Sequence, residues 1–339
     1  MADALVINDT TYAGEHASYM LVRAVVGADT VQKGAAMVQD GIKKKFTIPR
    51  VEVGNFMQPR VATPTSKGSI TVDAASLEPA NQMLYVEFNP RDFEAHWFAT
   101  QLENRLIDET LPATAENFIM LQMMKRLNEW FEMAFWQSRT EFNPVGAAVN
   151  PSTKGVNESG SPFYDSDGTP SMYYWNGFIK KAIDSTATVK VTSPVALTSG
   201  NVRDKLTEAL AKLPKALLFK FGAQGTRILM SYQDKAKYDE ALRTDTYKNI
   251  MSNEPGYDKY RGYDIVVLSG LPENTFFVVV ARPDNQSNTW IGINSVDDNT
   301  LNLQRLQNNS ELYFIKGLFK TDVTFGFFDQ VVLYTTQTA

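Results

Sequence analysis

The longest regular pattern of apolar and polar positions spans residues 114–139 and has the spacing of a single amphipathic helix. No Gly or Pro interrupts it, and about two dozen residues at 1.5 Å each predict a rod of about 36 Å. Thr114 suits the N-cap, while Glu116 in the first turn and Arg139 at the far end match the helix dipole. The apolar positions share one face, which we expect to be buried: Met120, Met123, Met124, Leu127, Trp130, Phe131, Ala134 and Phe135.

A β-strand pattern replaces the helical one from residue 46 to about residue 93. Apolar residues recur along it as on extended strands: Phe46, Ile48, Val51, Val53, Ile70, Val72, Leu84, Val86 and Phe88. Residues 59–68 (PRVATPTSKG) favour a turn between them. The pattern predicts a long hairpin whose arms, of about fifteen residues each, would reach roughly 50 Å. Because a two-stranded ribbon is at best marginally stable alone, we expect it to lie on another subunit.

The rest of the chain divides around this hairpin. The segment before it carries few apolar positions, so we interpret it as an arm that gains order by lying on another surface. Near Pro194 a mixed α/β pattern begins, and the strand pattern at 313–325 is expected to return to the first unit. We therefore predict five parts: an N-terminal arm at 1–45, an extended β-hairpin loop at 46–93, a first unit at 94–193, a second unit at 194–306 and returning strands of the first unit at 307–339.

Composition narrows the classes of function. The 339 residues include 33 basic and 38 acidic side chains, and this net charge of −5 argues against a protein that wraps nucleic acid through a basic surface. The absence of cysteine excludes disulfides, thiolate metal sites and a Cys nucleophile. His16 and His96 are far apart in sequence, and no acid–base pair of carboxylates is recognisable. We predict no catalytic residue, no metal site and no cofactor, and we find no secretory signal or apolar stretch of membrane-spanning length.

Two polar clusters are candidate contacts between subunits. The first is the basic run Lys43, Lys44 and Lys45, for which a solvated charge run is the alternative interpretation. The second lies at the predicted tip of the hairpin: Thr65, Ser66, Lys67 and Gly68. We expect the lysine run to contact an acidic patch on a neighbouring subunit.

The order of these parts resembles the major capsid proteins of tailed bacteriophages. Residues 311–327 (ELYFIKGLFKTDVTFGF) and 329–334 (DQVVLY) look like the closing strands of that family, and residues 227–231 (RILMS), which precede a helix, look like its strand-then-helix step. The resemblance implies an α+β protein with the Hong Kong 97-type capsid fold. In this fold the hairpin is an extended loop over a neighbour, the helix at 114–139 is the spine of the peripheral domain, and the unit at 194–306 is the axial domain.

The resemblance also implies a structural role and no enzymatic activity. Such a subunit self-assembles as hexamers and pentamers into the icosahedral head of the virion, in the host cytoplasm and without a membrane. The head encloses double-stranded DNA without sequence-specific binding. The implied partners are further copies of the chain, a portal, decoration proteins and scaffolding. Because only residues 1–45 precede the hairpin, scaffolding is expected to be a separate protein if Met1 is the gene's own start.

Two other functions stay open at this point. An encapsulin-like shell would use the same fold to enclose a cargo enzyme, and a cargo-enzyme gene beside this one would favour it over portal, terminase and protease genes. A hydrolytic α+β enzyme would need a pocket with paired carboxylates, for which the sequence offers no motif. Hollow shells in electron microscopy would favour the first two functions over the third.

Overall fold

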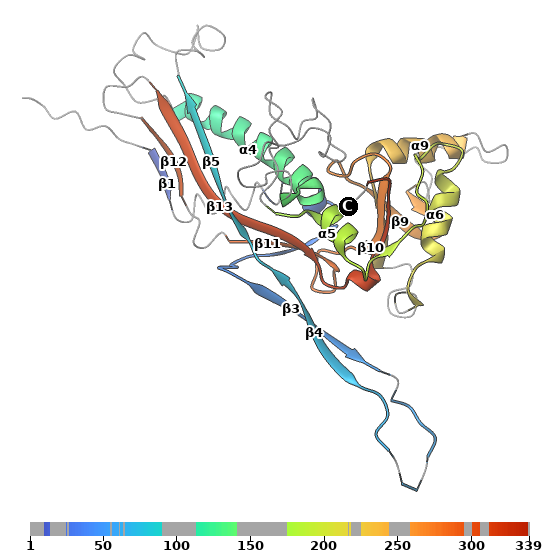
Figure 1. Cartoon of the computed structure of the whole chain (residues 1–339). Helices are drawn as coiled ribbons and strands as arrows, with labels where there is room; N and C mark the ends of the chain where they lie inside the picture. Colours follow the sequence, from blue (N-terminus) through green and yellow to red (C-terminus); the bar gives the residue numbers. More distant parts are fainter. Residues whose placement is uncertain are drawn as a thin grey trace, which may run out of the picture.

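The computed structural model describes residues 10–13, 25, 27–54, 56–60, 62–63, 65–89, 113–140, 175–215, 217, 225–243, 258–294, 300–305 and 312–337. Two six-stranded sheets with their helices form a body, and a two-stranded ribbon projects from it (Figure 1). No helix in these ranges combines the length and apolar character needed to cross a bilayer.

The first sheet is organised around one long strand, β13 (Tyr313–Phe325). Along one side of β13 runs β5, and along the other side run β12 and β11, followed by β1 and β2 at the outer edges. The bounds of these strands are Thr10–Ala13 for β1, Met37–Gln39 for β2, Ala80–Phe88 for β5, Thr289–Ile293 for β11 and Thr300–Arg305 for β12. Ile315, Phe319 and Val323 of β13 lie on one face of the sheet and are buried, and Phe319 and Val323 belong to the first core.

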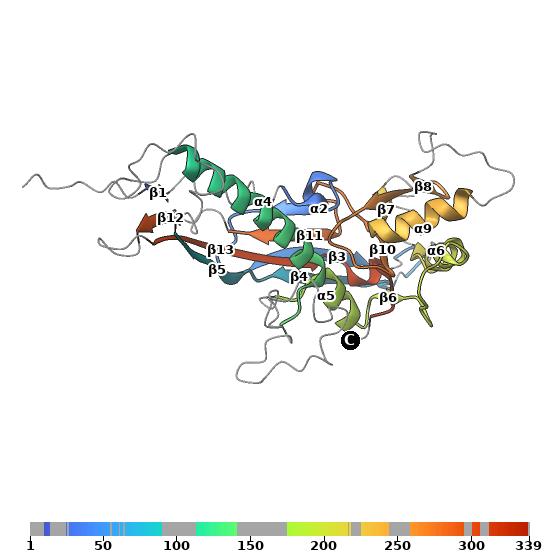
Figure 2. The same ribbon diagram turned by 90° about the horizontal axis from the view of Figure 1, so that it is seen from above.

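The helix expected at 114–139 is α4 (Ala113–Gln137), which lies along one face of the first sheet (Figure 2). Phe131 and Phe135 have no exposed surface, and Leu127 is partly buried against the same core. The ring of Phe131 packs edge-on against that of Phe319, with centroids 5.3 Å apart. The predicted burial is therefore confirmed for the second half of this helix face, from Leu127 to Phe135. The side chain of Met120 lies outside the described residues.

The second sheet has the strand order β6, β14, β10, β7, β9, β8. These strands span Val189–Lys190, Val332–Thr335, Thr275–Val280, Thr226–Met230, Tyr263–Val267 and Lys259–Tyr260, respectively. Two helices, α6 (Val202–Ala211) and α9 (Tyr232–Arg243), pack beside it, and their apolar side chains join a second core. The hydroxyl of Ser231 accepts a hydrogen bond from the backbone N–H of Asp234 at 3.1 Å and so caps α9.

Three strands lie in a different sheet from the one that the sequence predicted. β11 and β12, expected in the second unit, pair with β13, whereas β14, expected in the first unit, pairs with β10. The reason is burial on both faces: Val332 and Tyr334 of β14 pack in the second core, and Leu333 packs in the first. A strand between two cores has no polar face, so its pattern does not indicate which sheet it joins.

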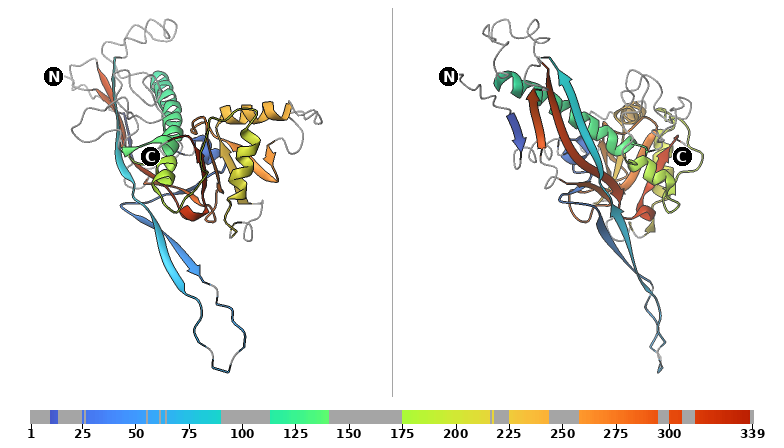
Figure 3. Two further views of the ribbon diagram at one scale, coloured as in Figure 1. Left: turned by 45° about the vertical axis from the view of Figure 1, so that its right-hand side comes forward. Right: turned by 60° about the vertical axis from the view of Figure 1, so that its left-hand side comes forward.

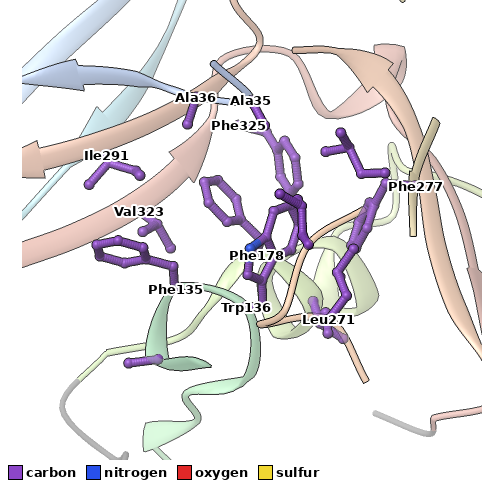
Figure 4. Close-up of a cluster of buried hydrophobic side chains, with 14 of the residues drawn as sticks. Ala35, Ala36, Phe135, Trp136, Phe178, Leu271, Phe277, Ile291, Val323 and Phe325 are labelled. Carbon is purple, nitrogen blue, oxygen red and sulfur yellow. The ribbon is translucent and has the colours of Figure 1, made fainter. Parts of the chain in front are cut away.

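The first core joins the two sheets. Trp136 of α4 packs against Phe178 of α5 (Phe178–Asp184) and Phe277 of β10, with ring centroids 4.9 and 5.4 Å apart (Figure 4). Phe325 of β13 contacts both of these phenylalanines. Helices and strands of both sheets therefore share one set of buried aromatic side chains.

Part of the predicted N-terminal arm belongs to this body. Val25, Ala28, Ala35 and Ala36 are buried in the first core around the short helix α2 (Asp29–Gln32). Figure 4 places Ala35 and Ala36 beside the core side chains of the first sheet. Small side chains add little to an apolar pattern even where the backbone is closely packed, which is why this segment had the pattern of an arm.

A buried carboxylate lies where three segments meet. Glu132 of α4 accepts hydrogen bonds from the N–H of Thr30 at 2.7 Å, the hydroxyl of Thr30 at 2.8 Å and the N–H of Gly270 at 3.3 Å. The indole N–H of Trp136 donates to the same hydroxyl at 2.8 Å. Burial raises the pKa of Glu132, with a smaller contribution from the charge of Asp29, although the donated hydrogen bonds act in the opposite direction.

Glu132→Gln should remove the pH dependence that this carboxyl gives to stability. A raised pKa in the folded chain means that its contribution is full below the ordinary value of 4.5 and is lost as pH rises through the folded pKa. The free energy of unfolding of the wild type, relative to the variant, should therefore fall as pH rises above 4.5 and then level off. Urea unfolding at a series of pH values measures this difference. If the free energy of unfolding of the wild type, relative to the variant, instead grew with pH, the three hydrogen-bond donors would affect the pKa of Glu132 more than burial does.

Candidate functional site

The ribbon formed by β3 (Phe46–Val53) and β4 (Ile70–Leu77) is the part of the described structure that projects farthest from the body. The two strands are antiparallel, with Phe46 opposite Leu77 at the body and Val53 opposite Ile70 farther out. Both views in Figure 3 show the ribbon extending beyond the sheets and helices. This feature matches the predicted excursion of the chain.

The projecting ribbon is shorter than the predicted hairpin, because β5 belongs to the body. All nine residues of β5 pair with β13, from Ala80 opposite Thr321 to Phe88 opposite Tyr313. The side chain of Gln82 donates to the hydroxyl of Thr321 at 2.9 Å. The expectation that all of 46–93 lacks packing within its own subunit is therefore wrong for β5, and the ribbon is confined to residues 46–77.

The base of the ribbon is anchored by a small apolar cluster. Ile48 and Leu77 are buried with Trp290 of β11 and Ile42. The ring of Phe46 lies 6.3 Å from the ring of Trp290, centroid to centroid. The inner end of the ribbon is thus held by its own subunit.

The apolar residues of the ribbon change face along its length. Successive side chains of a strand point to opposite faces, so Ile48 and Val51 point in opposite directions. Val51 and its cross-strand partner Val72 expose 61% and 74% of their surface, and Ile70, on the same face, exposes 71%. The outer half of the ribbon therefore presents an uncovered apolar strip, formed by Val51, Ile70 and Val72, on the face opposite to the one that docks on the body.

The tip beyond this strip is also exposed. Phe56 and Met57 expose 63% and 71% of their surface. The predicted tip cluster, Thr65, Ser66, Lys67 and Gly68, is exposed here as well, and the side-chain amide of Gln58 donates to the carbonyl oxygen of Thr65 at 3.1 Å. Arg60 and Lys67 are the charged residues of the sequence from 54 to 69, so the tip is basic.

The lysine run lies at the opposite end of the ribbon. Lys43, Lys44 and Lys45 are exposed in the segment that leads into β3. The ammonium group of Lys45 is 2.9 Å from a carboxylate oxygen of Glu78 in the same chain, and its hydrogen bond and charge lower the pKa of Glu78. The two predicted clusters are therefore separated by the length of the ribbon, and their contact with other subunits stays a prediction.

Sequence reasoning did not select the apolar strip as a functional site. A signal was present: the apolar positions of β3 change from even numbers, at Phe46 and Ile48, to odd numbers, at Val51 and Val53. Because side chains alternate along a strand, this change of parity indicates two apolar faces at different distances from the body.

Within the described ranges, no group of three or more acidic or histidine side chains could hold a metal ion.

Comparison with known proteins adds the fold family. Neither a protein-family model nor a curated protein sequence matches the chain. A chain of the satellite phage P4 procapsid with its size determination protein is similar at a TM-score of 0.55 and 9% identity, covering 97% of this chain and 94% of that one. The capsid of the native GTA particle gives 0.52 and 10%, and the capsid of Myoviridae phage XM1 gives 0.51 and 10%; each covers 100% of this chain and 96% of the other. The α+β fold of the Hong Kong 97 type, expected from the sequence, is confirmed.

Proposed function

We propose that this chain, which has the Hong Kong 97-type capsid fold, is the major capsid protein of a tailed bacteriophage. In this role it self-assembles as hexamers and pentamers into the icosahedral head that encloses the genome, and it has no enzymatic activity. The observation that carries the proposal is the ribbon, whose outer apolar strip is uncovered in a single subunit. The capsid structures that share the fold over nearly the whole chain support the same role.

The strip supports assembly because a single subunit leaves it in water. Burying a Val or Ile side chain contributes about 1.5–3 kcal/mol relative to leaving it exposed. Val51, Ile70 and Val72 therefore offer several kcal/mol to a partner that covers them. We assign that partner as a second copy of the chain, since each copy in a shell both extends a ribbon and receives one.

The two sheets correspond to the two domains of such a subunit in this proposal. The peripheral domain consists of the first sheet with α4 as its spine, and the axial domain consists of the second sheet with α6 and α9. This division follows strand pairing and so moves β11 and β12 to the peripheral domain and β14 to the axial domain.

The remaining partners follow from the same role. A separate scaffolding protein, a portal and decoration proteins would complete the head, which assembles in the host cytoplasm and becomes part of the virion. The enclosed double-stranded DNA would be held without sequence-specific contacts. The excess of 38 acidic over 33 basic residues supports this, because a mildly negative wall repels phosphate.

Trypsin should cut the ribbon tip of unassembled subunits after Arg60 and Lys67, both exposed basic residues. The same sites should be protected in assembled shells, because a neighbouring subunit that covers the ribbon blocks the access of a protease to its tip. Gel electrophoresis and mass spectrometry of the fragments measure both states. The double variant Arg60→Gln, Lys67→Gln is the control, since it must lose these fragments. Equal rates of cutting in subunits and shells would contradict coverage of the ribbon.

A further inference from the structure

A charged contact joins the ribbon to its own body, beyond the apolar cluster at its base. The guanidinium group of Arg50 in β3 donates to both carboxylate oxygens of Asp329, at 2.8 and 2.9 Å. The same guanidinium carbon lies 5.1 Å from the ring centroid of Phe327. The side chain of Arg50 is 17% exposed and that of Asp329 is 41% exposed, so the contact is shielded from water mainly on the arginine side.

This contact lies at the point where the ribbon leaves the body. Inward of Arg50, Ile48 is buried; outward of it, Val51 and residues 70–72 of the opposite strand are exposed. Roughly eleven residues at about 3.3 Å each place the tip about 35 Å farther out. A rotation of about 10° at Arg50 would then move the tip by roughly 6 Å, enough to misplace a side chain on a partner surface.

On the body, Asp329 and Phe327 lie in a segment that other contacts hold in place. Asp329 belongs to the short 3-10 helix η3 (Phe328–Gln330), through which the chain crosses from β13 in the first sheet to β14 in the second. The side chain of the buried residue Asn288 accepts from the N–H of Phe327 at 2.6 Å and donates to its carbonyl oxygen at 2.8 Å. The residues that receive Arg50 are therefore held from a second direction, at the junction of the two sheets.

We infer that Arg50 is a positioning residue, and that its paired contact with Asp329 and Phe327 sets the direction in which the ribbon leaves the subunit. A lysine could not replace it, because an ammonium group lacks the planar fork that binds both carboxylate oxygens. The effect on assembly rests on the proposed function. In a shell, the direction of the ribbon determines where the apolar strip meets a second copy, and hence how uniform the shells are.

A distance measurement on unassembled subunits tests this inference. The chain has no cysteine, so Ser66→Cys at the tip and Ala187→Cys on the body introduce unique sites for two spin labels. Electron–electron resonance gives the distribution of distances between them. In the Arg50→Ala background the distribution should become at least about twice as wide, since the tip is a lever of about 35 Å. Arg50→Lys should give an intermediate width, and the exchange Arg50→Asp with Asp329→Arg should restore part of the narrowing.

Arg261→Ala is the matched control. Arg261 is exposed and rests over the ring of Tyr260 at 5.7 Å in the second sheet, away from the ribbon, so its removal should leave the distribution unchanged. If Arg50→Ala reduces folding, Asp329→Asn breaks the pair from the more exposed side and should broaden the distribution equally. An unchanged width in a folded Arg50 or Asp329 variant overturns the positioning role.

Shell formation by the same variants distinguishes failure of the positioning role of Arg50 from failure of the proposed capsid function. If the positioning role holds, Arg50→Ala shells should be fewer and more variable in diameter than wild-type shells in electron microscopy. Wild-type shells together with unchanged distances in Arg50→Ala would reject the positioning role and retain the capsid function. A wild-type protein that never forms shells would reject the capsid function, while the distances would still decide whether Arg50 directs the ribbon.

Discussion

Phe131→Ala should lower the free energy of unfolding of the subunit by about 3–5 kcal/mol. Phe131 has no exposed surface, stacks on Phe135 with centroids 5.7 Å apart, and packs edge-on against Phe319 of β13. The substitution removes a large side chain from between α4 and the first sheet and leaves a cavity that the surrounding aromatic rings cannot fill. Urea unfolding of unassembled subunits measures the change.

Phe56→Ala is the matched control, because it removes the same side chain from the exposed tip of the ribbon. Phe56 is 63% exposed, so its removal should change the stability of the unassembled subunit by no more than about 0.5 kcal/mol. A loss below about 1 kcal/mol for Phe131→Ala would contradict the burial of this helix face.

Val72→Asp should strongly weaken shell assembly while the subunit stays folded. Val72 is 74% exposed and faces away from the body, so a carboxylate at this position costs little in the free subunit. Covered by a second copy, the same carboxylate would be desolvated without a partner, at a cost of several kcal/mol for each ribbon. The critical concentration for assembly should therefore rise at least about tenfold, since each 1.4 kcal/mol is a factor of ten. Sedimentation of assembled particles measures it.

Thr71→Asp is the control for this prediction. Thr71 is the neighbouring residue of β4, is also exposed, and points to the opposite face of the ribbon. The variant introduces the same charge without entering the apolar strip, and it should assemble like the wild type. Assembly of Val72→Asp at wild-type concentrations, or equal loss in both variants, would contradict the assignment of the strip as the covered face.

Elements marked by one regular local pattern could be predicted from the sequence. The helical spacing of residues 114–139 predicted α4 to within two residues at each end, and its apolar face placed Phe131 and Phe135 in the core. The turn-forming run at 59–68 placed the tip of the ribbon correctly between β3 and β4. In each case one local pattern was sufficient to place the element, because its ends are recognisable. The pattern did not show that Glu132 and Trp136, outside the predicted apolar face of the helix, are also buried.

The pairing of strands and the burial of small side chains were harder to predict from the sequence. The alternating pattern of β5 is the same whether it pairs with another arm of a hairpin or with β13, and only the long strand far along the chain decides between them. Ala35 and Ala36 are buried because the backbone comes close to the sheet, which no apolar count detects. The paired contact of Arg50 joins residues 279 apart in sequence, and each residue alone resembles an ordinary surface charge.

Several sequence expectations fall on residues outside the described ranges. They include residues 94–112 of the predicted first unit and the two histidines, His16 and His96. These expectations stay predictions.

Electron microscopy of the purified wild-type protein tests the capsid function most directly. The proposed function predicts closed, hollow, icosahedral shells, with the density of each ribbon lying against an adjoining subunit through the strip of Val51, Ile70 and Val72. Persistent monomers across protein concentration, salt and pH, with the scaffolding protein supplied, would contradict it.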